Sequence, residues 1–105
     1  MAFNYHRIVI KIGSNVFTQP DGLPDHQRIG HLVAQIAEIK KAGKEVILVS
    51  SGAVASGRSM ITISEKADAV AARQLLASIG QVKLINTYSS LFGQYGMLCS
   101  QVLVT

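Results

Sequence analysis

The sequence contains one cysteine, no tryptophan and no long hydrophobic run. The single cysteine, Cys99, excludes an internal disulfide, which fits a reducing compartment. No apolar stretch approaches the length needed to cross a bilayer, and the first residues, Met1–Arg7, lack the apolar core of a secretory signal peptide. We therefore expect a cytoplasmic protein that does not interact with a membrane.

Charged residues are also scarce, at 15% of 105 residues, whereas hydrophobic residues make up 49%. This balance argues against disorder and suffices for one domain, residues 1–105, with a modest core. The net charge of +4 comes from scattered basic residues, without the runs or interleaved aromatics of a nucleic-acid surface. The apolar excess predicts a sheet covered by further chain or by another subunit, and we expect a homo-oligomer.

The first half of the chain predicts a strand, a helix and a second strand. Residues 6–12 are mostly branched aliphatics, as in a strand buried on both faces. After a loop with two prolines, Asp25 can cap a helix whose apolar residues recur at helical spacing, and Gly43 ends it. Residues 45–50 form the second strand. A helical crossover makes the two strands parallel, so both end at the same edge of the sheet, where ligands collect.

The second half predicts three helices and a third strand. Residues 52–57 open a short helix against the sheet, and a longer helix covers residues 64–80 with its first residue as the cap. A separate apolar pattern predicts a helix over residues 84–96, and residues 97–104 form a strand that buries Cys99. This order predicts an α/β fold that corresponds to half of a layered domain.

Lys11, near the end of the first strand, is the first candidate binding residue. Burying an unpaired lysine is costly, so its amine either reaches solvent or meets an anion in the crevice at the strand ends. Gly13, Ser14 and Asn15 follow as a turn. Glycine lets the backbone approach a ligand closely, and exposed N–H groups attract anions, which favours phosphate contact.

A second turn, Ser51, Gly52 and Ala53, follows the second strand. Here a serine hydroxyl and the first N–H groups of a helix face one spot, an arrangement that suits a carboxylate or a phosphate. The alternative is a tight turn whose small residues only let the helix lie close to the sheet. With both turns at one edge, the sequence indicates a protein that handles phosphate or carboxylate groups.

Residues 52–59 also have the glycine spacing of a P-loop, but Arg58 stands in place of the lysine. The arginine fork does not replace a lysine point charge, and the last predicted strand has no aspartate to help hold magnesium. The sequence therefore disfavours a P-loop nucleotidase. The three histidines lack the spacing of a helical zinc pair, so no metal ligand is assigned. Packing is the simplest role for Tyr88, Phe92 and Tyr95.

Taken in order, these motifs resemble the amino acid kinase family. The resemblance rests on the lysine–glycine turn in residues 9–16, Ser-Ser-Gly-Ala in residues 49–58, Gln-Leu-Leu-Ala in residues 74–81, and residues 91–103. It spans nearly the whole chain. It implies a three-layer αβα sandwich with a mainly parallel sheet, incomplete in this chain.

Within the family, the motifs are most similar to kinases that act on glutamate. The resemblance implies ATP, as its magnesium complex, as the donor of a γ-phosphoryl group. The implied acceptor is the side-chain carboxylate of L-glutamate, and the implied product is γ-glutamyl phosphate. This reaction is the first step of proline biosynthesis. The family's lysine that contacts the transferred phosphoryl group matches Lys11, and its glycine turn beside the phosphates matches Gly13, Ser14 and Asn15.

The glutamate-binding serine of these kinases matches Ser51, with Gly52 and Ala53 beside it. The family's other glutamate-site residues and its adenine-binding half lie beyond Thr105, so we expect the chain alone to be inactive. Two alternatives stay open: another amino acid or carboxylate kinase of the same fold, and a folded fragment without catalytic function.

Overall fold

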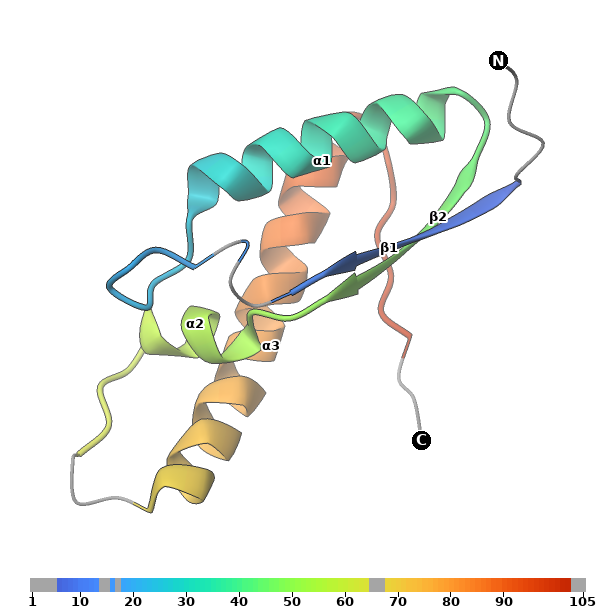
Figure 1. Cartoon of the computed structure of the whole chain (residues 1–105). Helices are drawn as coiled ribbons and strands as arrows, with labels where there is room; N and C mark the ends of the chain where they lie inside the picture. The colour runs from blue at the N-terminus through green and yellow to red at the C-terminus, as the bar shows by residue number, and fades with distance from the viewer. Residues whose placement is uncertain (1–5, 14–15, 17, 65–67, 103–105) are drawn as a thin grey trace.

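A computed structural model describes residues 6–13, 16, 18–64 and 68–102. The elements in chain order are β1 (Arg7–Ile12), α1 (His26–Lys41), β2 (Glu45–Ser50), α2 (Ala53–Arg58) and α3 (Ala69–Gly93). β1 and β2 form a two-stranded parallel sheet, and the helix α1 connects them (Figure 1). The predicted strand–helix–strand unit is confirmed.

The ends of α1 follow from local side-chain chemistry. The Asp25 carboxylate accepts a hydrogen bond from the Arg28 backbone N–H at 3.1 Å, which caps the first turn. Lys40 and Lys41 lie in the last turn, where cations are favoured by the helix dipole. Gly43 has a φ of +89°, in the region that glycine adopts readily, and this residue turns the chain into β2.

Side chains alternate between the two faces of the sheet, and only one face is covered. Ile12 is buried, and Ile10, Val46 and Leu48 pack against the core on the covered face. Residues from both α1 and α3 complete this core: Ile29, Val33, Ile36, Leu84, Tyr88 and Phe92. On the other face, Val9, Ile47 and Val49 are 61%, 44% and 49% exposed. The described residues thus make two layers of an α/β fold.

One long helix replaces the two predicted over residues 64–80 and 84–96. α3 runs without interruption through Gly80, and its N-terminal cap is Asp68, whose carboxylate accepts from the Ala71 N–H. The prediction of two helices is wrong because Gly80, which resembles a helix end in the sequence, does not end the helix. In the structure this glycine keeps helical geometry and is needed where α2 packs against α3.

The third strand, predicted over residues 97–104, is also wrong for the part that the structure describes. Residues 97–102 form no strand, and residues 103–105 lie outside the described residues. The segment and β2 both line a cavity of about 630 Å³, so backbone hydrogen bonds do not close the space between them. Leu98 is fully exposed and Val102 is 82% exposed, and Cys99 is half-buried in this irregular segment.

Packing was the predicted role of three aromatic residues, and two of them take it. Tyr88 and Phe92 lie in the core, with ring centroids 6.3 Å apart. Tyr95 is instead 38% exposed, and the Lys41 ammonium lies 5.5 Å from the centre of its ring. Among the described helices, none combines the length and hydrophobicity that crossing a bilayer requires.

Candidate functional site

The first residues of the two turns singled out in the sequence, Gly13 and Ser51, lie at one edge of the sheet. Ile12 pairs with Ser50 at the last position of the ladder, so both strands end together. The next N–H group, that of Ser51, donates a hydrogen bond of 3.0 Å to the Ile12 carbonyl. Gly13 and Ser51 therefore leave the sheet side by side. Two members of the first predicted turn, Ser14 and Asn15, lie outside the described residues.

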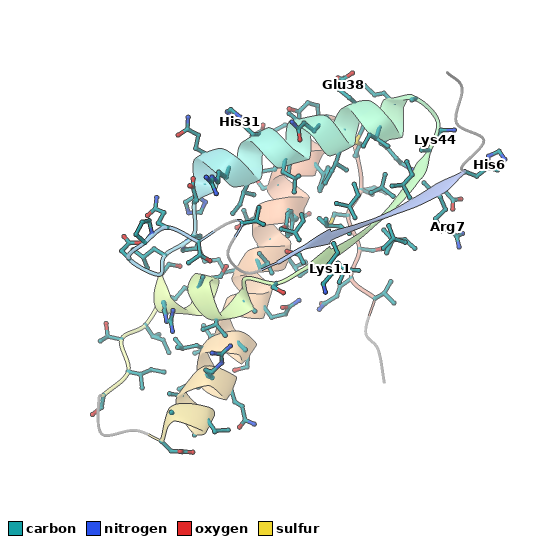
Figure 2. All side chains as sticks on the ribbon, viewed as in Figure 1. His6, Arg7, Lys11, His31, Glu38 and Lys44 are labelled. Atoms are coloured by element: carbon teal, nitrogen blue, oxygen red, sulfur yellow. The ribbon has the colours of Figure 1, made fainter. Side chains whose placement is uncertain are left out.

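Lys11 lies one residue before this edge, on the open face of the sheet. Its register partner is Val49, and both side chains alternate with the buried positions of their strands. Figure 2 shows the Lys11 side chain on the side of the strands away from α1. Among the described residues, no carboxylate pairs with it. Its ammonium group is thus available to an anion at the carboxyl edge of the sheet.

Gly13 adds an open stretch of backbone beside that lysine. A methyl group placed on Gly13 would meet no atom within 4 Å, so nothing in the described structure fills the space in front of it. The Gly13 carbonyl accepts a hydrogen bond from the Val16 N–H at 3.1 Å. The local geometry leaves room for a ligand atom to approach the main chain.

The second turn has a backbone conformation that glycine adopts readily and that would strain any residue with a side chain. Gly52 has a φ of +132° and immediately precedes α2, and its carbonyl accepts from the Ser56 N–H at 2.9 Å. Ser51 is exposed, whereas Gly52 and Ala53 are half-buried. Ser51 is therefore exposed at the sheet edge, whereas Gly52 and Ala53 lie against α3.

A hydrogen-bond pair that the sequence did not reveal lies directly beneath this turn. The Tyr88 and Ser50 hydroxyl oxygens are 2.7 Å apart, and the Ser50 hydroxyl also donates to the Ser51 carbonyl at 3.1 Å. Burial raises the pKa of Tyr88, with a smaller upward effect of Cys99, and the Ser50 hydrogen bond opposes both. The sequence predicts only a packing role for Tyr88. Its hydroxyl was the available signal, because a buried tyrosine oxygen needs a partner.

Two glycines bring α2 against α3 at the same place. A methyl group on Gly80 would overlap the Ala53 carbonyl oxygen, and one on Gly57 would overlap the Leu76 carbonyl oxygen. The contact between the helices is therefore backbone against backbone, and Figure 1 shows α2 lying directly against α3. Gly80 thus fixes the position of Ala53, the last residue of the second candidate turn.

The same contact excludes a P-loop over residues 52–59. A P-loop needs an open loop whose N–H groups surround phosphates before the helix starts. Here α2 begins at Ala53, and Gly57 is buried inside it against α3. The described residues also contain no group of three histidine, cysteine, aspartate or glutamate side chains placed to hold a metal ion.

Comparison with known proteins agrees with this arrangement of motifs. Residues 6–105 match the amino acid kinase family. The whole chain is 51% identical to the glutamate 5-kinase of Bacteroides thetaiotaomicron and covers 29% of that protein. It is 41% identical over 102 residues to the glutamate 5-kinase of Clostridium acetobutylicum, covering 38% of it. Over 101 residues it is 45% identical to that of Chlorobaculum tepidum, covering 28%. The chain thus spans about a third of these relatives.

Proposed function

Because the chain belongs to the amino acid kinase family, we propose that residues 1–105 form the amino-terminal, glutamate-binding part of a glutamate 5-kinase. Such an enzyme transfers the γ-phosphoryl group of ATP to the side-chain carboxylate of L-glutamate. The product, γ-glutamyl phosphate, is the first intermediate on the route to proline. The observation that supports the proposal is that Gly13 and Ser51 follow paired strand ends at one sheet edge, where the Ser51 N–H bonds the Ile12 carbonyl.

In this proposal the first turn serves the phosphates. Transfer requires two anions, a carboxylate and a terminal phosphate, to approach each other, so positive charge and N–H donors must offset their repulsion. The exposed Lys11 ammonium supplies the charge and contacts the transferred phosphoryl group. Gly13, Ser14 and Asn15 border the phosphates. The open space in front of Gly13 supports a close approach there.

The second turn holds the acceptor. The Ser51 hydroxyl contacts glutamate, and the backbone of Gly52 and Ala53 borders the same molecule. These residues leave β2 beside the end of β1, so glutamate bound there lies next to phosphates bound at Gly13. Positioning of this kind contributes much of the catalysis in phosphoryl transfer.

ATP enters this site as its magnesium complex, in which the metal neutralises phosphate charge. The chemistry of the described residues fits the phosphate part: an exposed lysine and open main chain are donors to anions. We assign no residue of this chain as a metal ligand.

The open face of the sheet supports a three-layer sandwich in the whole enzyme. Parallel sheets are normally covered on both faces, yet Val9, Ile47 and Val49 are exposed here. We expect a second helical layer, from residues outside this chain, to cover them. We further expect a homo-oligomer in the cytoplasm.

The direct test is acyl-phosphate formation by the full-length protein that carries residues 1–105. With ATP, magnesium and hydroxylamine as the trapping agent, L-glutamate should give hydroxamate far faster than L-aspartate or acetate. The 105-residue chain alone should give none above background. Faster reaction with another of these acids would instead identify a different carboxylate kinase of the family.

Replacing Gly52 with alanine should weaken glutamate binding. Alanine is strained at a φ of +132°, at a cost of about 1–3 kcal/mol, and relief of that strain moves the Ser51 turn. We expect the KM for glutamate to rise about tenfold or more, with a smaller change in the KM for ATP.

Gly43→Ala is the matched control, because Gly43 also has a positive φ, +89°, but precedes β2 at the opposite edge of the sheet. It should lower the melting temperature of the full-length protein to a similar extent and leave the KM for glutamate unchanged. Equal KM changes in both variants would remove Gly52 from the proposed glutamate site.

A further inference from the structure

Tyr88 is joined to the second turn by a chain of two hydrogen bonds. Its hydroxyl lies 2.7 Å from that of Ser50, which in turn lies 3.1 Å from the Ser51 carbonyl oxygen. Tyr88 belongs to α3 and is only 3% exposed, so its ring is held by the core while its oxygen reaches the sheet edge. The chain of bonds therefore connects the rigid interior to the main chain of the candidate glutamate site.

The direction of these bonds follows from the number of protons. A serine hydroxyl has one proton, and Ser50 donates it to the Ser51 carbonyl. The Tyr88 hydroxyl must then be the donor to Ser50. Only a neutral tyrosine can donate. A phenol is neutral near pH 7, and burial raises the pKa of Tyr88 further. A phenylalanine ring could fill the same space but could not donate.

The Ser51 main chain is thereby held from both sides. Its N–H donates to the Ile12 carbonyl at 3.0 Å, and its carbonyl accepts from Ser50. Ser51 itself is exposed, so its hydroxyl remains available to a ligand. We propose that Tyr88 is a positioning residue for glutamate, acting through Ser50 to fix the main chain from which Ser51 contacts the substrate. This inference rests on the proposed function.

The inference predicts a selective change in Tyr88→Phe. The full-length protein should keep its ring packing against Phe92, whose centroid lies 6.3 Å away, and lose only the donor. We expect the KM for glutamate to rise about three- to tenfold, as for loss of one hydrogen bond. The KM for ATP should stay within about twofold and kcat should fall less than the KM rises.

Three further variants separate positioning from general stability. In Ser50→Ala/Tyr88→Phe, the rise in KM for glutamate should equal that of Ser50→Ala alone, because both changes break the same chain of bonds. Tyr95→Phe removes the hydroxyl of an exposed tyrosine in contact with Lys41 and should leave the KM for glutamate unchanged.

The outcomes distinguish failure of the positioning role of Tyr88 from failure of the proposed function. A selective rise in the KM for glutamate with non-additive double-variant kinetics supports the positioning role. If the wild-type protein phosphorylates glutamate and Tyr88→Phe changes only the melting temperature, the inference is overturned and the proposed function stands. If the wild-type protein phosphorylates no glutamate, both fall.

Discussion

Replacing Lys11 with methionine is expected to lower kcat of the full-length protein about 100-fold or more, with little change in its melting temperature. The side chain lies on the open face of the sheet, so its loss removes no core packing. Its ammonium group is proposed to stabilise charge on the transferred phosphoryl group, and removing such a donor costs about 10²- to 10³-fold in rate. The effect should fall on turnover rather than on the KM for glutamate.

Two variants make this result specific to position 11. Arg7→Met removes a cation from the same face of β1 at the other end of the strand, where Arg7 pairs with Glu45 at 2.8 Å, and it should keep kcat within about threefold. Lys11→Arg keeps the charge but replaces a point charge with a broad fork, so it should restore only part of the activity. Near-normal turnover of Lys11→Met would remove this residue from the catalytic proposal.

Replacing Gly80 with alanine is expected to destabilise the protein by about 3 kcal/mol or to prevent folding. The added methyl group would overlap the Ala53 carbonyl oxygen and also come close to the Gly57 backbone nitrogen. These are main-chain atoms, which cannot rotate away as a flexible side chain can. The gain in helix propensity from glycine to alanine, about 1 kcal/mol, is too small to offset this overlap.

Gly30→Ala is the matched control for Gly80→Ala. Gly30 lies inside α1, and a methyl group there meets nothing within 4 Å. It should therefore raise the free energy of unfolding by about 0.5–1 kcal/mol, the usual helix preference for alanine. Urea unfolding of both full-length variants provides the measurement. A Gly80→Ala protein as stable as wild type would contradict the close approach of α2 and α3.

The first half of the fold could be predicted because local signals decide it. The Asp25 cap, the apolar stripe of α1 and the left-handed Gly43 act over a few residues each. The second half depends on contacts between distant segments. Gly80 looks like a helix end in the sequence, and only its contact with Ala53 shows why a glycine sits inside α3. A strand over residues 97–104 likewise needs a partner edge, which an apolar pattern alone does not provide.

The candidate site also has one part that the sequence predicts and one part that depends on contacts between distant segments. That Lys11 and Ser51 would approach one edge followed from the parallel crossover, a rule of topology. The bond between Tyr88 and Ser50 joins residues 38 positions apart, and no spacing rule links a helix hydroxyl to a strand end at that separation. The sequence therefore predicts that Lys11 and Ser51 approach one sheet edge, but it does not predict the hydrogen bond between Tyr88 and Ser50.

The uncovered strip of Val9, Ile47 and Val49 has a practical consequence for anyone who produces residues 1–105 alone. Three branched aliphatic side chains side by side on an exposed sheet face attract detergent, fluorescent hydrophobic dyes and neighbouring molecules. Poor solubility is therefore the expected behaviour of such a sample even when its sheet is correctly folded.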